Sequence, residues 1–190
     1  MNPERPVSFS RLSPPARLPS RPPSGPTATV RVVDVYPYRM RGVARVFLVL
    51  RRAAGHAYAG QWRMVGGKIE PGEAAWQAAR RELAEETGFA PGSGLAAFWA
   101  LPSVNTFYEW QRDTVALVPA FAAHVSGDPQ LDGEHDAFAW LPAEAAAARL
   151  AWPEQRRLLT LADALLDAGG VPPELAIPLD APLQTPPDAL

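Results

Sequence analysis

The chain has 190 residues, of which 47% are hydrophobic and 20% charged, a composition typical of one globular domain with its own core. Its 18 basic and 20 acidic residues leave a net charge of −2, which argues against stable nucleic-acid binding, so an anionic substrate would need a metal ion or a local basic patch. The absence of cysteine excludes disulfides, thiolate catalysis and thiolate metal sites. No apolar run reaches the roughly 20 residues of a membrane helix, and residues 1–26 lack the apolar centre of a signal peptide, so we expect a cytoplasmic protein without membrane contact.

Proline-rich segments flank the predicted domain. Residues 1–27 are dominated by Pro, Ser and Arg, which favours a flexible arm because too little buried surface offsets the entropy of ordering them. The domain is expected over residues 28–168 and a Pro-rich tail over residues 169–190. Four apolar residues interrupt this tail and indicate that part of it lies against the domain or a second subunit: Leu175, Ile177, Leu179 and Leu183.

Short β-branched and apolar runs predict the strands. TVRVVDVY over residues 29–36 partly alternates, and ARVFLVL over residues 44–50 is typical of a buried strand. Further strands are predicted over residues 95–101, 113–125 and 137–141.

Helical patterns alternate with these strands. Residues 73–87 contain strong helix formers without Pro or Gly, and Gly88 follows them as a stop signal. A short Ala-rich helix is predicted over residues 142–150 and an amphipathic helix over residues 154–168. Mixed strands and helices together predict an α/β layered domain.

Three glutamates stand near the end of the first predicted helix. Glu82, Glu85 and Glu86 have the i, i+3, i+4 spacing that places side chains on one helical face, where like charges repel. A divalent cation would offset the repulsion, and carboxylate oxygens suit Mg²⁺ or Mn²⁺. Arg81 stands four residues before Glu85, so we expect it to hold a carboxylate in position. For this fragment alone, a solvated acidic helix face is the alternative.

A glycine pair upstream favours the metal site over the solvated face. Gly66 and Gly67 allow a turn that brings a carbonyl or an amide close to a metal ion or a phosphate. Lys68 adds a donor near the same place, and Glu73 lies in the first helical turn, where the macrodipole favours a negative charge. Together these features predict a loop–helix unit with its acidic face beside a glycine turn.

The segment GGKIEPGEAAWQAARRELAEETGF over residues 66–89 resembles the Nudix box in full. Nine specified positions over 23 residues make the motif very specific, and the resemblance extends over about residues 29–168. The matching residues are Gly67, Glu73, Arg81, Glu82, Leu83, Glu85, Glu86, Gly88 and Phe89.

The resemblance implies the Nudix fold, an α/β/α sandwich around a mixed β-sheet, and cleavage of a diphosphate linkage in a nucleotide-like small molecule. By position it implies that Mg²⁺, or alternatively Mn²⁺, is held by the box glutamates and by the carbonyl of Gly66. It gives structural or positioning roles to the remaining motif residues. These are Gly67, Glu73, Arg81 and Gly88.

The mechanism follows from the charge of a polyphosphate, which repels water and hydroxide. Metal ions neutralise the phosphate oxygens and position water, and a carboxylate takes the proton of that water. Glu82 is one candidate for this base, and family members differ on the point because some use a glutamate from a later loop.

Glu134 is such a later glutamate, in the segment DGEHDAFAWLP. This segment and the following AAAAR…WPEQRRLL resemble the bacterial dATP and dihydroneopterin triphosphate pyrophosphatases, which implies that Glu134 is a metal ligand or the base. A solvated loop acid is an equal alternative, and we expect His135 to be a structural or surface residue. The expected catalytic set is therefore Arg81, Glu82, Glu85, Glu86 and Glu134.

Aromatic and basic residues are candidates for substrate contact. Trp62, Phe107, Tyr108 and Trp110 could stack on a base or a pterin, with core and sheet packing as the alternative. Five basic residues are candidates for phosphate contact, of which we expect no more than two to act: Arg51, Arg52, Arg63, Lys68 and Arg112. The selected substrate-binding residues are Arg51, Lys68, Tyr108 and Arg112.

Three functions stay open at this point. The favoured one is a hydrolase that releases pyrophosphate and the monophosphate from a nucleoside or pterin triphosphate. A second is a Nudix hydrolase of an oxidised dGTP, a dinucleoside polyphosphate or ADP-ribose. A third is a non-catalytic nucleotide-binding regulator, although such modules usually lose a box glutamate. The sequence does not decide between a monomer and a homodimer, which is frequent among similar proteins.

Overall fold

The computed structural model describes residues 25–168 and 171–181. Most of the arm predicted over residues 1–27 lies outside these ranges, as does Leu183 of the tail.

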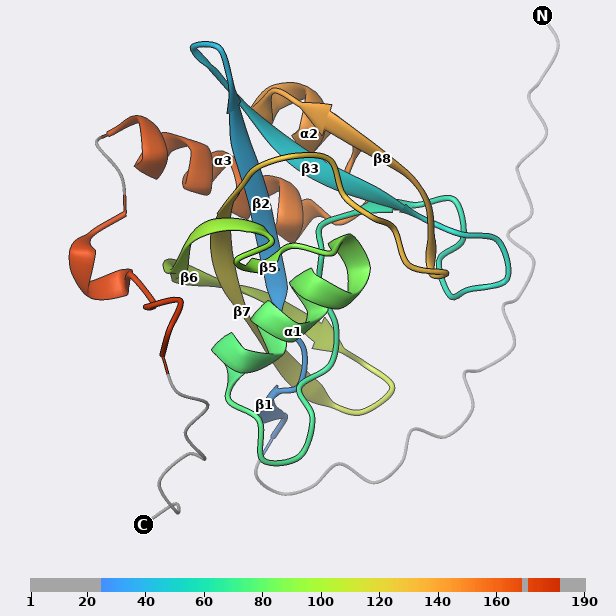
Figure 1. The fold of residues 1–190 in the computed structure, drawn as a ribbon. Coiled ribbons are helices and arrows are strands. Elements are labelled where there is room, and N and C mark those ends of the chain that lie inside the picture. Colours follow the sequence, from blue (N-terminus) through green and yellow to red (C-terminus); the bar gives the residue numbers. More distant parts are fainter. Residues whose placement is uncertain (1–24, 169–170, 182–190) are drawn as a thin grey trace, which may run out of the picture.

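A mixed sheet, eight-stranded over the described residues, forms the centre of the molecule (Figure 1). Strands β2 and β3 pair antiparallel, as do β6 and β7, whereas β1 and β2 both run parallel to β7. Strand β8 lies antiparallel to β3. The strands are β1 (Thr27–Val30), β2 (Asp34–Arg41), β3 (Ala44–Arg52), β4 (Trp62–Arg63), β5 (Ala90–Pro91), β6 (Gly94–Glu109), β7 (Thr114–Val125) and β8 (His135–Leu141).

Helices cover both faces of this sheet. Helix α1 (Ala75–Thr87) packs on one face, and α2 (Ala143–Arg149) and α3 (Pro153–Asp167) pack on the other (Figure 1). A short 3₁₀ turn, η1 (Pro173–Leu175), follows α3. The predicted α/β/α sandwich around a mixed sheet is therefore confirmed.

The side chains of β3 explain why helices are needed on both faces. Leu48 and Leu50 point into the core that α1 covers, whereas Phe47 and Val49 point into the core that α2 and α3 cover. All four are fully buried. A strand with apolar residues at successive positions buries both faces of its sheet, which is why the unbroken run VFLVL is a central strand.

Two predicted strands differ from the structure. The strand expected over residues 29–36 is wrong as a single element, because the chain leaves one strand at Val30 and enters the next at Asp34. Between them Val33 pairs with the glycine loop instead of with a strand. The strand expected over residues 95–101 continues to Glu109, since the polar stretch after it pairs with β7 beyond a shift in register.

The helices agree more closely with the sequence. Those predicted over residues 142–150 and 154–168 are shifted by only one residue at each end. Helix α1 starts at Ala75 instead of Glu73, because Glu73 belongs to the preceding turn, where its amide donates to the carbonyl of Glu70 at 3.0 Å.

The C-terminal segment packs on the domain. The amide of Ile177 donates to the carbonyl of Phe98 at 2.9 Å, and Arg80 Nη2 donates to the carbonyl of Leu179 at 3.0 Å. The side chains of Ile177 and Leu179 pack against the core under α1. The prediction that part of the tail lies against the domain is therefore confirmed. No helix in the described residues is long and apolar enough to cross a membrane.

Candidate active site

The glycine loop is fixed against the start of β2. The amide of Val33 donates to the carbonyl of Gly67 at 3.0 Å, and that of Val35 donates to the carbonyl of Val65 at 2.8 Å. A Cβ on Gly66 would overlap the carbonyl oxygen of Val33, and a Cβ on Gly67 would overlap the carboxylate of Glu82. Both positions therefore need glycine so that backbone and carboxylate can approach each other closely.

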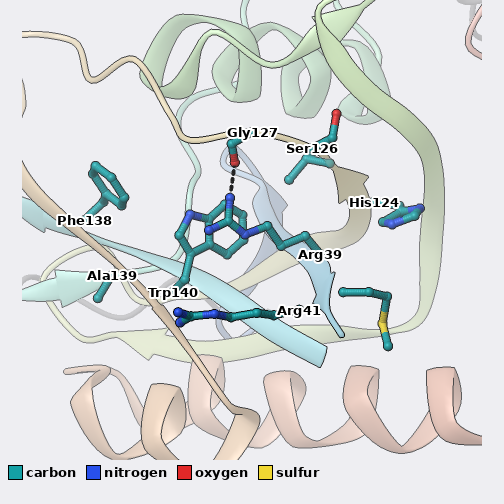
Figure 2. Close-up of a pocket in the computed structure, with 10 residues that line it drawn as sticks. Arg39, Arg41, His124, Ser126, Gly127, Phe138, Ala139 and Trp140 are labelled. Carbon is teal, nitrogen blue, oxygen red and sulfur yellow. Dashed lines mark hydrogen bonds between the residues drawn. The ribbon is translucent and has the colours of Figure 1, made fainter. Parts of the chain in front are cut away.

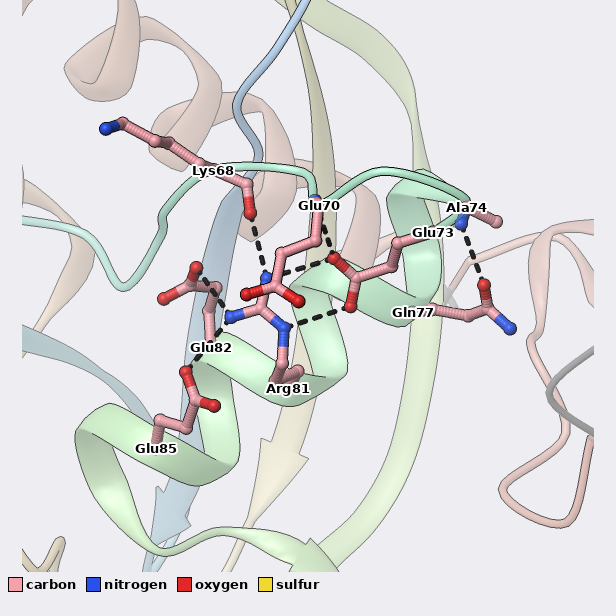
Figure 3. A network of polar contacts seen from close by, with 8 residues as sticks. All are labelled: Lys68, Glu70, Glu73, Ala74, Gln77, Arg81, Glu82 and Glu85. Carbon is pink, nitrogen blue, oxygen red and sulfur yellow. Dashed lines mark hydrogen bonds and ion pairs between the residues drawn. The ribbon is translucent and has the colours of Figure 1, made fainter.

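Arg81 joins this loop to α1 through its whole guanidinium group (Figure 3). Nε and Nη2 donate to the two carboxylate oxygens of Glu73, at 3.0 Å each, and Nη2 also donates to the carbonyl of Lys68 at 2.8 Å. Nη1 donates to Glu82 at 2.9 Å and to Glu85 at 3.0 Å. The planar fork of arginine suits this bidentate pairing, which lysine cannot reproduce.

The carboxylates of the site have different electrostatic environments. The hydrogen bonds from Arg81 hold the pKa of Glu73 below its usual value. Burial raises the pKa of Glu82, although Arg81 opposes this shift. Burial also raises the pKa of Glu86 well above its usual value, with a further contribution from the charge of Glu82. Glu86 is only 4% exposed and accepts one hydrogen bond, from the amide of Gly66 at 3.3 Å.

These donors suit a divalent cation by their chemistry. Burial raises the cost of ionising both Glu82 and Glu86, the charge of Glu82 adds to that cost at Glu86, and a hard divalent ion compensates such oxygen ligands. Within residues 25–168 and 171–181, however, no three acidic or histidine side chains converge closely enough to hold an ion as they stand. Arg81 contacts Glu82 and Glu85 instead, so the predicted ligand set stays a prediction that requires these side chains to turn from the guanidinium to the ion.

The loop before β8 faces the same acids. Glu134 accepts a hydrogen bond from Arg52 Nη1 at 2.5 Å, which lowers its pKa. The charge of Glu134 helps to raise the pKa of Glu82, and that of Asp132 helps to raise the pKa of Glu86. The structure therefore brings Glu134 within electrostatic reach of the box glutamates, as its predicted role requires.

His135 lies at the start of β8 and is buried. Its Nδ1 is 2.9 Å from a carboxylate oxygen of Asp132, and burial lowers its pKa. This placement fits the structural role expected from the sequence.

The predicted substrate-binding residues lie in separate places. Lys68 is exposed on the glycine loop, beside the carbonyl that Arg81 binds. Arg51, on β3, donates through Nε to Asp136 at 2.7 Å. Tyr108 and Arg112 lie farther along the chain, at the β6–β7 hairpin.

The two hairpin residues make local contacts. Tyr108 Oη donates to Asp113 at 2.7 Å, and Arg112 lies 3.6 Å from a carboxylate oxygen of Glu109. Their roles toward a substrate stay predictions.

Comparison with known proteins supports the assignment that this geometry suggests. The model of the NUDIX domain matches residues 28–162, most of the chain. The chain belongs to the NUDIX domain family. Its box is therefore a Nudix box by family as well as by pattern.

Similar proteins carry several names. The chain is 34% identical over 148 residues to an octanoyltransferase of Myxococcus xanthus, covering 71% of this chain but only 37% of that protein. It is 31% identical over 104 residues to the nucleoside triphosphatase NudI of Klebsiella pneumoniae, covering 52% of this chain and 74% of that protein. The structure of the dihydroneopterin triphosphate pyrophosphohydrolase of E. coli superposes with a TM-score of 0.56 at 26% identity, covering 70% of this chain and 92% of that one.

A hollow on the molecule lies away from the Nudix box (Figure 2). It measures about 660 Å³ and is lined in part by Arg39, Arg41 and Trp140. Arg39 stacks at 4.2 Å over the ring of Trp140, and Asp128 accepts hydrogen bonds from both side chains at 3.0 Å. The box lies at the start of β2 and this hollow at its end, and no predicted site residue lines it.

A polar cluster that the residue pattern did not predict lies directly behind the Nudix loop. The carboxylate of Asp34 accepts hydrogen bonds from Asn105 Nδ2 at 2.7 Å and from Gln155 Nε2 at 2.9 Å. Asp34 Oδ1 lies 3.2 Å from where a Cβ of Gly66 would be. An aspartate inside the run VRVVDVY was the available signal, since an unpaired charge is rarely placed in a buried strand.

Proposed function

We propose that the chain is a Mg²⁺-dependent pyrophosphohydrolase that cleaves a diphosphate linkage in a nucleoside triphosphate or pterin triphosphate, releasing pyrophosphate and the monophosphate. One observation carries the proposal. Arg81 ties the glycine loop to a helix on which Glu86 is buried and Glu82 half-buried, and the charge of Glu82 adds to the cost of ionising Glu86. Such a site gains from a divalent cation and from the phosphates that accompany it.

Each residue has a part in this proposal. Glu82, Glu85 and Glu86 hold the ion together with the carbonyl of Gly66, and Glu134 joins them from the loop before β8. Arg81 is a positioning residue, since it contacts the acids and the loop. Gly67, Glu73 and Gly88 keep the loop and the helix in place. The exposed basic and aromatic residues that we propose for the substrate are Arg51, Lys68, Tyr108 and Arg112.

The chemistry is addition of water to a phosphorus atom of the anhydride. A bound Mg²⁺ supplies charge neutralisation of the phosphate oxygens and lowers the pKa of water. A carboxylate oxygen of Glu82 or Glu134 accepts the proton of the attacking water. The P–O bond of the anhydride then breaks, and pyrophosphate leaves with the electron pair.

The substrate class rests on two kinds of support. One is the names of similar proteins, a nucleoside triphosphatase and a dihydroneopterin triphosphate pyrophosphohydrolase. The other is the resemblance of the segment around Glu134 to the dATP and dihydroneopterin triphosphate pyrophosphatases. The name of the octanoyltransferase is not carried over, because the matched region is 37% of that longer protein.

The test is a substrate panel with Mg²⁺ or Mn²⁺ and identification of products by mass spectrometry. The panel contains the nucleoside and deoxynucleoside triphosphates, 8-oxo-dGTP, dihydroneopterin triphosphate, a dinucleoside tetraphosphate and ADP-ribose. We expect pyrophosphate and a monophosphate from one of the triphosphates. If the dinucleoside tetraphosphate or ADP-ribose is cleaved preferentially, that compound takes the place of the proposed substrate. Binding of a nucleotide without turnover would show that the protein is a non-catalytic nucleotide-binding regulator.

Variants of the box acids test the site. Glu85→Gln and Glu86→Gln keep the side-chain shape but remove the charge, so we expect turnover to fall nearly to background while the far-UV circular dichroism is unchanged. Glu144→Gln is the matched control, because Glu144 is an exposed acid in the first turn of α2 and lies outside the box. Full activity in either box variant would overturn the ligand assignment.

The proposal also covers the domain and its setting. We propose residues 28–168 as the hydrolase domain, a range close to the 28–162 of the family match. We further propose a cytoplasmic protein that acts on small molecules and does not bind nucleic acid stably, in keeping with its net charge of −2. Sedimentation equilibrium distinguishes a monomer from a homodimer.

A further inference from the structure

A buried polar cluster lies on the α3 side of the sheet, behind the Nudix loop. Asp34 is its centre and accepts hydrogen bonds from Asn105 of β6 and Gln155 of α3. Gln155 in turn accepts a hydrogen bond from the amide of Met64 at 3.3 Å. The charge of Arg63, on β4, acts on Asp34 as well. Residues of β6, α3 and β4 therefore converge on one carboxylate of β2, next to the proposed phosphate site.

Three polar atoms of this region have no hydrogen-bond partner among the described residues, although all three are buried. They are Arg63 Nε, Trp152 Nε1 and Asn105 Oδ1. Buried polar groups are almost always hydrogen-bonded, because an unpaired one loses its hydrogen bonds to water and gains none within the protein. Two unpaired donors and one unpaired acceptor within one cluster indicate that something else supplies their partners.

Aromatic rings from three different elements surround these atoms. The ring of Trp152 meets that of Tyr58 edge to face at 5.6 Å and lies 6.4 Å from that of Phe107. The guanidinium of Arg63 lies over Tyr58 at 5.0 Å and over Trp152 at 5.8 Å. Phe107 and Asn105 are two residues apart on β6 and so share one face of the strand.

Tyr58 adds an observation of its own. It has a φ of 63°, a left-handed conformation that non-glycine residues seldom adopt, and its side chain is 51% exposed. The loop that carries it is closed at its base, where Gly60 donates to the carbonyl of Arg52 at 2.9 Å. Local strain that the surrounding structure maintains is common where a loop covers a ligand.

We infer that this cluster recognises the ring of the substrate, and that the ring carries the oxo group, the adjacent ring N–H and the second acceptor nitrogen that guanine and pterins share. Arg63 Nε and Trp152 Nε1 offer two donors, which match two neighbouring acceptors such as O6 and N7 of guanine. Asn105 Oδ1 offers one acceptor, which matches a ring N–H. The flat faces of Trp152, Phe107 and Tyr58 suit stacking on a heterocycle.

Adenine and cytosine match this set less well, because each presents an amino donor where the keto bases present an oxygen acceptor. Uracil and thymine also present two acceptors and a ring N–H, but on a single ring, which offers less surface for stacking than guanine or a pterin. The inference rests on the proposed function for the phosphate part of the ligand but makes a separate statement about its ring.

The test is direct binding of GMP, AMP and neopterin to the full-length protein by isothermal titration calorimetry, without added metal and without turnover. We expect GMP to bind at least about ten-fold more tightly than AMP, in line with the usual discrimination by a bidentate contact. Tighter binding of GMP than of neopterin assigns a nucleotide substrate, and the reverse order assigns a pterin. The inference is overturned if GMP and AMP bind with equal affinity and neopterin binds no more tightly than either.

Two variants locate the effect. Trp152→Phe keeps an aromatic ring but removes Nε1, and Arg63→Lys keeps a cation beside Asp34 but removes Nε. Each variant is expected to bind the preferred ligand, GMP or neopterin, about ten-fold more weakly, while its affinity for AMP changes less than two-fold. Trp140→Phe is the matched control, since Trp140 lies at the other end of β2 with its Nε1 bonded to Asp128. An equal loss for all ligands would show a structural role, and if a variant fails to fold, the wild-type preference still decides.

The outcome is separable from that of the proposed function. A protein that prefers GMP or neopterin over AMP but hydrolyses no triphosphate retains this inference and loses the proposed activity. A protein that hydrolyses all nucleoside triphosphates at equal kcat/KM retains the activity and loses the inference.

Discussion

Gly67 sets how closely the Nudix loop approaches α1. The Glu82 carboxylate occupies the space that any side chain at this position would need, and the loop cannot retreat because β2 holds it through Val33 and Val35. A hydrogen atom in place of a side chain is therefore the condition for bringing the loop carbonyls beside the acids.

Gly66→Ala should damage the fold and Gly67→Ala the site. A Cβ at Gly66 would overlap the backbone oxygen of Val33, so we expect a loss of about 1–3 kcal/mol in the free energy of unfolding. A Cβ at Gly67 would meet the end of the Glu82 side chain, which can turn away, so we expect weaker Mg²⁺ binding with little loss of stability. Urea unfolding and calorimetry with Mg²⁺ measure the two effects. Gly133→Ala is the control for stability, since a Cβ there meets no atom within 4 Å. An unchanged midpoint for Gly66→Ala would contradict the crowding.

Tyr38 gives a prediction about alkaline pH. Burial raises its pKa from its usual 10.0 to about 12, against the opposing charge of Arg45. Between these values the unfolded chain loses the phenol proton while the folded protein keeps it, so the free energy of unfolding falls as the pH rises from 10 to about 12. Tyr38→Phe should make this fall less steep, as followed by urea unfolding.

At the scale of elements, the loop and α1 form one unit because Arg81 binds Glu73 and the carbonyl of Lys68 at the same time as the acids of the helix. Arg81→Lys keeps the charge but cannot maintain these contacts together. We expect kcat to fall by about 10–100-fold, the usual cost of losing a group that orients metal ligands, with a smaller change in KM.

Arg80→Lys is the matched control for this variant. Arg80 is the neighbouring arginine on α1, but it lies over Trp76 and donates to the carbonyl of Leu179. Its replacement should leave kcat within two-fold of the wild type. Equal losses in both variants would mean that Arg81 acts through helix stability instead of through the loop.

Local signals predicted the elements well where packing follows the residue pattern. The apolar run of β3 and the alanine-rich start of α1 specify a buried strand and a helix by themselves, and the four-residue spacing of Arg81 and Glu85 predicted that this arginine holds a carboxylate. The contacts of Arg81 with Glu73 and with the carbonyl of Lys68 were not predicted. The division between β1 and β2 was not predictable, because it depends on Val33 pairing with a loop more than 30 residues away. The same holds for Asp34, whose partners Asn105 and Gln155 come from distant parts of the chain.

At the scale of the whole molecule, the C-terminal segment completes the face that α1 covers. Ile177 packs on this core and bonds to β6 through its amide. Ile177→Ala should lower the free energy of unfolding by about 1 kcal/mol, since the side chain is only partly buried, and should leave turnover unchanged. Thermal unfolding and a turnover assay check both parts, with Asp180→Asn as an exposed control. A normal melting temperature would show that the segment is dispensable.

The guanidinium of Arg81, at the centre of the box, also affects the metal-free protein. Because Arg81 already forms ion pairs with Glu73, Glu82 and Glu85, chelation with EDTA should leave the apoprotein folded and free of aggregation, unlike proteins whose metal is their main cross-link. A bound divalent ion would take the place of the guanidinium at Glu82 and Glu85. The apoprotein should thus be a stable resting form, ready for loading.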